Sequence, residues 1–206
     1  MPKETFFRLR DEKQESILRS AIHEFNQHGF ERAKICDIAK GAKVATGSIY
    51  QYFEDKNELI MYCAQWSYEI FMQKLNMREV VKNVDIFEYF DDSLREQRIV
   101  NQEQELIKFM QLLSTQPDMM KESLAEMYEK SKEYIKPLIQ NTKDRGLIRT
   151  DLDNDVLTEF FIAVTERFKM RWLKEKPDFT NIETEEMKAE VNKMLELLKH
   201  GMCGSA

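Results

Sequence analysis

The stretch Gly41–Leu59, GAKVATGSIYQYFEDKNEL, decides how the rest of the chain is interpreted. It combines glycines, hydroxyl side chains and tyrosines with few apolar residues, which is unusual for a helix that packs into a core. The apolar residues Val44, Ile49 and Phe53 are nevertheless enough to lock it onto a scaffold. We therefore predict a short helix at residues 46–52 that is anchored on one side and turns a polar face outward.

The composition predicts a soluble, all-α protein. The chain has 206 residues, of which 42% are hydrophobic and 33% charged, with only 6 glycines and 4 prolines. So few helix breakers favour long helices over a many-stranded sheet. We see no apolar run long enough to cross a membrane and no signal-peptide pattern, so we expect a cytoplasmic protein. Three widely spaced cysteines form neither a disulfide framework nor a zinc pattern, and we expect no metal and no cofactor.

Charge is distributed unevenly along the chain. Residues 1–56 carry 10 Lys and Arg against 9 Asp and Glu, whereas the remaining residues carry 21 against 28. The N-terminal quarter is therefore the part of the chain that repels a polyanion least.

Apolar residues recur at helical spacing along nearly the whole chain, and we expect about nine helices. Gly29 is the predicted left-handed residue that ends the first of them. Asp55 and Glu58 form a predicted capping pair for the fourth, which should reach about Met77. The expected helices cover approximately residues 11–28, 35–42, 46–52, 55–77, 85–94, 102–113, 117–145, 151–176 and 183–200.

The second and third of these helices are short and are joined by a tight link at residues 42–45, which is the pattern of a helix-turn-helix motif. Ala39 is small enough to let the helices cross closely, and Val44 and Ile49 fill the angle between them. A short helix with exposed polar side chains suits the major groove of DNA. The alternative, on spacing alone, is a solvated connector helix with no binding role.

Residues 17–59 resemble the DNA-binding domain of the tetracycline-repressor (TetR) family. The resemblance rests on DIAK at 37–40, VATGSIYQYF at 44–53 and KNEL at 56–59, and it covers about a quarter of the chain. It implies an all-α fold in which an N-terminal three-helix domain with the helix-turn-helix motif precedes a C-terminal helical bundle.

The family layout also implies a division of labour along the chain. We expect a DNA-binding domain at 1–56, a bridging helix at 55–77, and a ligand-binding and dimerisation domain at 78–206. By resemblance, Tyr50 and Tyr52 bind phosphates, and a glutamine such as Gln51 can pair bidentately with adenine. The candidate DNA-binding residues are Lys34, Thr46, Gly47, Ser48, Tyr50, Gln51, Tyr52 and Lys56.

Three positions depart from the family pattern. Ala33 stands where a capping Ser or Thr is usual, so the second helix should start late or lean on its neighbours. Lys43 replaces the turn glycine, although lysine resists a positive φ. Ala45 replaces the serine before the recognition helix, and the capping role should pass to Thr46.

The resemblance implies a dimer formed by the last two helices and a pocket among the middle ones. The candidate dimer residues are Phe160, Phe161, Val164, Phe168, Trp172, Val191, Leu195 and Leu198. The candidate pocket residues are Trp66, Phe87, Phe90, Phe109, Met110, Leu113, Met127, Tyr128 and Tyr134. Such a lining suits an apolar or aromatic small molecule. For any single residue of either set, packing in the chain's own core is the alternative.

These expectations combine into a ligand-responsive repressor that binds a palindromic operator as a homodimer. One alternative is a constitutive DNA-binding regulator with a solid core and no effector. A remote alternative is a helical enzyme, for which the sequence offers no recognisable nucleophile, base or metal pattern.

Overall fold

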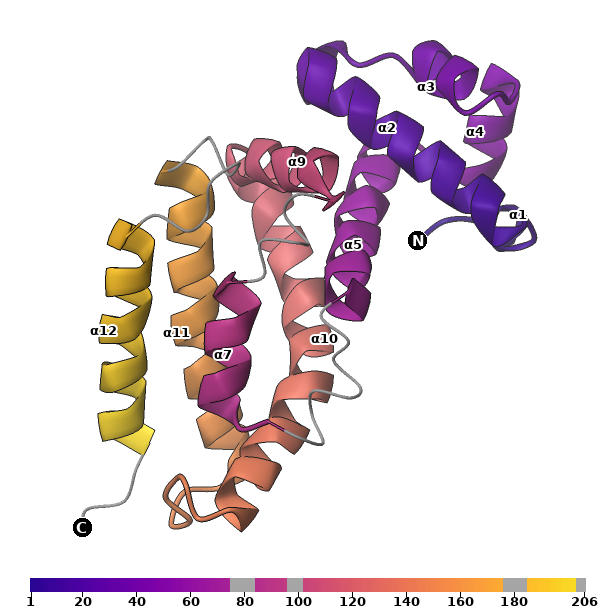
Figure 1. Ribbon diagram of the computed structural model, residues 1–206. Helices are drawn as coiled ribbons and strands as arrows, with labels where there is room; N and C mark the ends of the chain where they lie inside the picture. Colours follow the sequence, from indigo (N-terminus) through magenta and orange to yellow (C-terminus); the bar gives the residue numbers. More distant parts are fainter. Residues whose placement is uncertain (75–83, 96–101, 176–184, 203–206) are drawn as a thin grey trace. The chain divides into compact units, whose positions relative to one another are not determined.

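The computed structural model describes residues 1–74, 84–95, 102–175 and 185–202, and these residues form ten helices and no strand (Figure 1). The all-α fold is therefore confirmed. The helices are α1 (Glu4–Phe7), α2 (Asp11–Arg32), α3 (Ile35–Gly41), α4 (Thr46–Tyr52), α5 (Lys56–Lys74), α7 (Ile86–Arg95), α9 (Gln104–Ser114), α10 (Pro117–Asp144), α11 (Asn154–Glu175) and α12 (Glu185–Met202). The short α1 was not expected from the sequence. The end expected for α5 near Met77 falls outside the described residues.

The chain divides into two compact units. The first comprises Met1–Glu69 and Glu105–Ser123, and the second comprises Ile70–Gln104 and Leu124–Ala206. The first unit therefore contains more than the DNA-binding domain expected at 1–56, because α9 and the first turns of α10 belong to it.

The first unit is built on α2, whose apolar face is fully buried. Ile17, Ile22 and Phe25 expose 1% of their surface or less. Gly29 has φ +72° and ψ 166°, so it has the positive φ that glycine tolerates but not the left-handed helical conformation predicted for it, and the chain resumes a further helical turn to Arg32. The first helix is therefore kinked at Gly29, where the prediction placed its end.

An aromatic cluster shows why α9 belongs to the first unit. The ring of Phe109 lies 6.1 Å from that of Phe25 and 5.8 Å from that of Phe30. Asn26 Nδ2 also donates to the main-chain oxygen of Glu105 at 2.8 Å. Phe109 therefore packs inside the first unit, whereas the prediction placed it in a pocket of the domain at 78–206.

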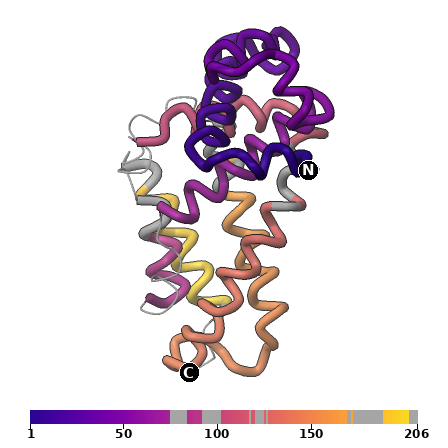
Figure 2. Tube along the Cα trace, turned by 90° about the vertical axis from the view of Figure 1, so that its right-hand side faces the viewer, coloured from indigo at the N-terminus to yellow at the C-terminus, as the bar shows by residue number. Residues whose placement is uncertain are grey.

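The second unit is a bundle in which α7, α11, α12 and most of α10 run along one another (Figure 2). Asp85 caps α7, because its carboxylate accepts from the main-chain nitrogens of Phe87 and Glu88 at 2.8 and 2.9 Å. Glu88 reciprocates by accepting from the nitrogen of Asp85 at 3.0 Å. This reciprocal pair satisfies donors at the start of α7 and fixes where the helix begins.

Candidate nucleic-acid interface

The polar helix predicted at residues 46–52 is α4, with the expected bounds. Ile49 and the following Phe53 are each 1% exposed and hold the helix on the body of the first unit. Thr46 and Gln51 are exposed, and Tyr50 keeps 52% of its surface open. One side of α4 is therefore anchored while its hydroxyl and amide side chains face solvent.

The turn between α3 and α4 depends on a lysine in the left-handed region. Lys43 has φ +55°, and its main-chain nitrogen donates to the oxygen of Lys40 at 3.1 Å. The nitrogen of Val44 donates to the oxygen of Ala39 at 2.9 Å. These two bonds form the Schellman arrangement that usually ends with glycine, so the helix-turn-helix connection is tight despite the substitution.

Two side chains of α2 position α3. The carboxylate oxygen Oε1 of Glu24 accepts from the main-chain nitrogen of Lys34 at 3.1 Å, so α3 leans on α2 at the end where a Ser or Thr cap is absent. Ser20 Oγ donates to the main-chain oxygen of Ile38 at 2.8 Å. The helices cross closely here, since a β-carbon on Gly41 would lie 2.3 Å from the same hydroxyl oxygen.

The start of α4 differs from the expected capping. Ala45 occupies the N-cap position and makes no side-chain cap bond, while Thr46 is already the first helical residue. The expected transfer of the cap to Thr46 is therefore wrong. A β-carbon on Gly47 would meet nothing within 4 Å, so the main chain at that residue lies open.

The two candidate lysines have different surroundings. Lys34 is exposed at the start of α3. Lys56 is half-buried, and its ammonium donates to the main-chain oxygens of Glu31 at 2.9 Å and Ala33 at 3.3 Å. Lys56 therefore ties the start of α5 to the end of α2, and one ammonium hydrogen remains for another acceptor.

The ring of Tyr52 contributes to packing as well as to the polar face. It is half-buried, and its centroid lies 6.0 Å from that of Phe6 in an edge-on arrangement. Ser48 is half-buried too. Of the six candidates on α4, the four most open to solvent are thus Thr46, Gly47, Tyr50 and Gln51.

The N-terminal segment supports α4 in a way that sequence reasoning missed. The main-chain nitrogen of Lys3 donates to the oxygen of Tyr52 at 2.8 Å, and Thr5 Oγ1 donates to the oxygen of Gln51 at 2.6 Å. Phe6 is completely buried beneath them. Nothing in the apolar periodicity of the sequence marks this segment, because only four of its residues are helical.

The candidate pocket residues are not gathered around one described cavity. Trp66, Phe109, Met110 and Leu113 belong to the first unit, and Phe87, Phe90, Met127, Tyr128 and Tyr134 belong to the second. The guanidinium carbon of Arg19 on α2 lies over the Trp66 ring, 5.2 Å from the centroid of that ring. A cavity of about 600 Å³ in the first unit, between the end of α2 and the start of α5, is lined by other residues.

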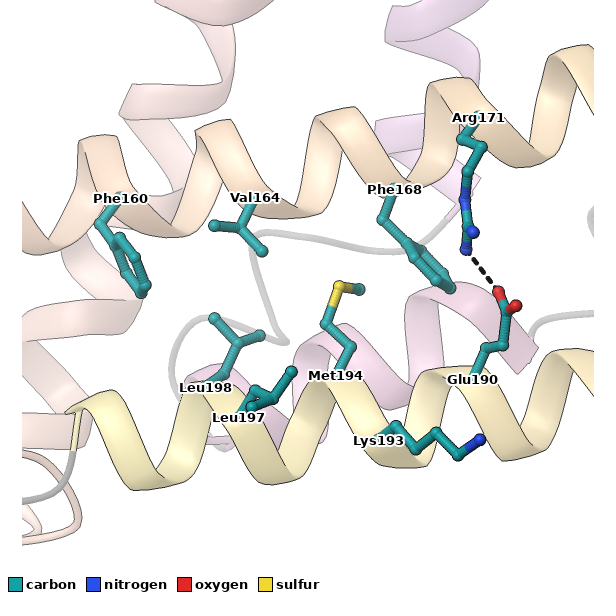
Figure 3. A pocket seen from close by; sticks show the side chains of 9 residues that line it. All are labelled: Phe160, Val164, Phe168, Arg171, Glu190, Lys193, Met194, Leu197 and Leu198. Carbon is teal, nitrogen blue, oxygen red and sulfur yellow. Dashed lines mark hydrogen bonds and ion pairs between the residues drawn. The ribbon is translucent and has the colours of Figure 1, made fainter.

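The candidate dimer residues divide between the interior and a groove of about 490 Å³ between α11 and α12 (Figure 3). Phe161 and Val191 are buried, and the Phe161 ring lies 5.8 Å from that of Phe90. Phe160 is 46% exposed along the groove, and Leu197, which was not among the candidates, is 74% exposed. The side chain of Trp172 lies outside the described part of the structure. The other four, Val164, Phe168, Leu195 and Leu198, are buried or half-buried.

Among the residues that the structure describes, no group of three or more His, Cys, Asp or Glu side chains is placed to hold a metal ion. None of their helices combines the length and apolar character needed to cross a membrane.

Comparison with known proteins connects these features to a family. The profile of the bacterial regulatory proteins, tetR family, matches residues 17–63. The probable acrEF/envCD operon repressor of Escherichia coli is 26% identical over 179 residues, which span 77% of this chain and 75% of the relative. The uncharacterized HTH-type transcriptional regulator YvdT of Bacillus subtilis is 43% identical over 60 residues, 29% of this chain and 28% of that protein.

Solved structures share the fold at low sequence identity. GusR of Salmonella enterica superposes with a TM-score of 0.70 at 18% identity, covering 94% of this chain and 99% of GusR. The regulator FadR from Bacillus subtilis, in complex with stearoyl-CoA, superposes with a TM-score of 0.64 at 20% identity, covering 91% of this chain and 98% of FadR.

Proposed function

Because this chain belongs to the TetR family of DNA-binding transcriptional regulators, we propose that it is a repressor that binds a palindromic operator as a homodimer and releases it when a small molecule binds. The family is not one of enzymes. The observation that carries the proposal is α4, a short helix anchored by the buried Ile49 and open on its polar side. We assign DNA binding to residues 1–56, a bridging role to 55–77, and effector binding and dimerisation to 78–206.

The proposed DNA contacts separate into readers of bases and binders of phosphates. Thr46 and Gln51 are exposed on α4 and carry groups that hydrogen-bond to base edges in the major groove. Tyr50 and Lys34 are exposed and suit phosphate oxygens, and the open main chain at Gly47 permits a close approach. Three further proposed DNA contacts lie at the edges of the same surface and come from half-buried side chains: Ser48, Tyr52 and Lys56.

The proposed dimer follows from the reach of α4 and from the groove on α11 and α12. One short helix contacts only a few base pairs, so an operator with two half-sites needs two copies. The groove is lined by exposed Phe160 on α11 and exposed Leu197 on α12, apolar side chains that a second copy would cover (Figure 3). In a four-helix bundle formed by α11 and α12 of both copies, these side chains would be buried and no longer exposed to water.

The proposed effector is an apolar or aromatic small molecule bound in the second unit. Phe90 and Met127 are buried there, and Thr158, on α11, is 2% exposed with a hydroxyl that has no hydrogen-bond partner among the described residues. An unpaired buried hydroxyl is costly, and a ligand group is one way to satisfy it. The effector must bind the two conformations of the dimer with different affinities to release DNA.

Selection from a pool of duplexes with a random 20-base-pair core tests DNA binding. The protein should enrich a palindrome, and Gln51→Ala should weaken binding by roughly tenfold and relax one base position in each half-site. Tyr50→Phe should weaken binding to selected and scrambled duplexes to similar extents, because a phosphate contact carries no sequence information. Recovery of no shared sequence would contradict the proposed function.

A separate titration tests the effector. Stearoyl-CoA and naphthalene serve as long-chain and aromatic probes, and Kd for the selected duplex is measured with and without each. A probe of the correct class should raise Kd at least tenfold and raise the melting temperature of the free protein. If a broader screen of apolar compounds also leaves Kd unchanged, the chain is a constitutive regulator.

A further inference from the structure

The carbonyl end of α4 is capped by residues from the beginning of the chain. The last carbonyl oxygens of a helix have no partner within the helix. Here Lys3 donates from its main-chain nitrogen to Tyr52 O at 2.8 Å and from Nζ to Tyr50 O at 3.2 Å. Thr5 Oγ1 fills the place between them, on Gln51 O at 2.6 Å. Three successive carbonyls of the proposed recognition helix are therefore held by two residues that are distant in sequence.

An aromatic anchor keeps this N-terminal segment in place. The Phe6 ring is completely buried, with its centroid 5.0 Å from that of Phe53 and 5.5 Å from that of Tyr62. Phe53 directly follows α4, and Tyr62 lies on α5. The anchor thus packs against the joint where α4 passes into α5, and it fixes Lys3 and Thr5 beside the carbonyls that they cap.

The opposite end of α4 is held from α2. Lys13 Nζ donates to the main-chain oxygens of Ala42 at 2.8 Å and Lys43 at 3.1 Å. These oxygens lie in the turn that leads into α4, beside the left-handed residue. A charged donor shared by two carbonyls gives stronger hydrogen bonds than a neutral one.

We propose that the segment from Lys3 to Lys13 fixes the position of α4 from both ends and thereby sets operator affinity without contacting the bases. The inference rests on the proposed function, in which α4 reads DNA. The seven-residue α4 is too short to be stable alone, and Ile49 is its single buried residue, so its orientation depends on contacts at its ends. Thr5 and Lys13 are positioning residues in this scheme.

The chemistry of Thr5 allows a clean test. Its hydroxyl has one hydrogen, which is already donated to Gln51 O, so it has none to donate to a phosphate. Thr5→Val removes the hydroxyl with little change in shape, and Thr5→Ser keeps it. Thr115→Val is the matched control, because Thr115 is exposed and its hydroxyl donates to Leu112 O within its own segment.

We expect Thr5→Val to raise Kd for the selected duplex about tenfold, with Kd for a scrambled duplex changing less than twofold. Thr5→Ser and Thr115→Val should keep the affinity of the unmodified protein. The slope of log Kd against log salt concentration should be unchanged in Thr5→Val, because no phosphate contact is lost. Equal affinity of Thr5→Val and Thr5→Ser would overturn the inference.

Lys13→Met tests the other end, with Lys108→Met as a control for the loss of one positive charge in the same unit. We expect about a tenfold loss of operator affinity for Lys13→Met and little change for Lys108→Met. A salt slope reduced by about 0.9 per site would instead identify Lys13 as a direct phosphate ligand and overturn its positioning role. If Gln51→Ala weakens binding while the Thr5 and Lys13 variants do not, the positioning inference alone fails. If none of them weakens binding, the proposed function fails.

Discussion

Ser20 on α2 and Gly41 on α3 occupy adjoining space, because a β-carbon on Gly41 would lie 2.3 Å from Ser20 Oγ. That oxygen is held in place by its hydrogen bond to Ile38 O at 2.8 Å. Alanine at position 41 would force the hydroxyl to rotate and lose this bond, although alanine itself is the better helix former by about 1 kcal/mol.

A double-mutant cycle separates the two effects. Gly41→Ala should be destabilising or neutral beside Ser20, but stabilising in the Ser20→Ala background, where the oxygen is absent. We expect a coupling of about 1 kcal/mol between the two sites, measured by urea unfolding. Additive effects within about 0.3 kcal/mol would show that α2 and α3 can move apart at this crossing.

Replacing Lys43 by glycine should stabilise the turn of the helix-turn-helix motif. Its φ of +55° costs a non-glycine residue about 1 kcal/mol, and its exposed side chain lies at the surface. Lys43→Gly should therefore raise the melting temperature by roughly 2–4 °C. Lys40→Gly, at an exposed helical residue three positions earlier, should lower it by a similar amount, since glycine weakens a helix interior. A lower melting temperature for Lys43→Gly would mean that the lysine side chain contributes a contact of its own.

The sequence predicts local features of this fold better than long-range ones. The bounds of α4 follow from polar residues around Ile49. The sequence also marks position 43 as the place of the turn glycine, and the structure shows that Lys43 adopts the positive φ there. The cap that Glu24 provides for Lys34 joins residues ten positions apart, and no short-range pattern encodes it. The N-terminal cap on α4 was missed for the same reason.

Apolar periodicity also says which face of a helix is buried but not what covers it. The spacing of Phe109 and Leu113 correctly indicates a buried face on α9. It cannot distinguish the lining of a pocket from packing against Phe25 and Phe30, which is where the Phe109 ring lies. The candidate pocket therefore mixed residues of both units.

Replacing Asp85 should destabilise the second unit. Its carboxylate is the cap of α7, and it is only 8% exposed. Asp85→Ala should lower the free energy of unfolding by about 1–2 kcal/mol, because two main-chain donors lose their acceptor. Asp85→Asn keeps an acceptor oxygen and should cost less than half as much. If the two variants are equally unstable, the ion pair with Arg145 at 3.8 Å matters more than the cap.

The buried thiol of Cys63 should make the folded protein less stable at alkaline pH. Its thiol is completely buried on α5, and burial raises its pKa far above the ordinary value. In the unfolded chain the thiol ionises above about pH 8.5, while in the folded chain it stays neutral. Because the pKa of Cys63 is higher in the folded protein than in the unfolded chain, its contribution to the free energy of unfolding is complete below about pH 8.5. Above about pH 8.5 that contribution declines by about 1.4 kcal/mol per pH unit.

Urea unfolding at pH 7, 8.5 and 10 measures this effect against Cys63→Ala. At pH 7 the unmodified protein should be the more stable, because alanine leaves a cavity. Its advantage should shrink by about 2 kcal/mol at pH 10, since Cys63→Ala has no thiol to ionise on unfolding. Cys36→Ala is the control for removing a thiol that is not buried, because Cys36 is exposed on α3. If the stability difference between the unmodified protein and Cys63→Ala does not change with pH, the Cys63 thiol ionises as readily in the folded protein as in the unfolded chain. That result would contradict a site closed to water.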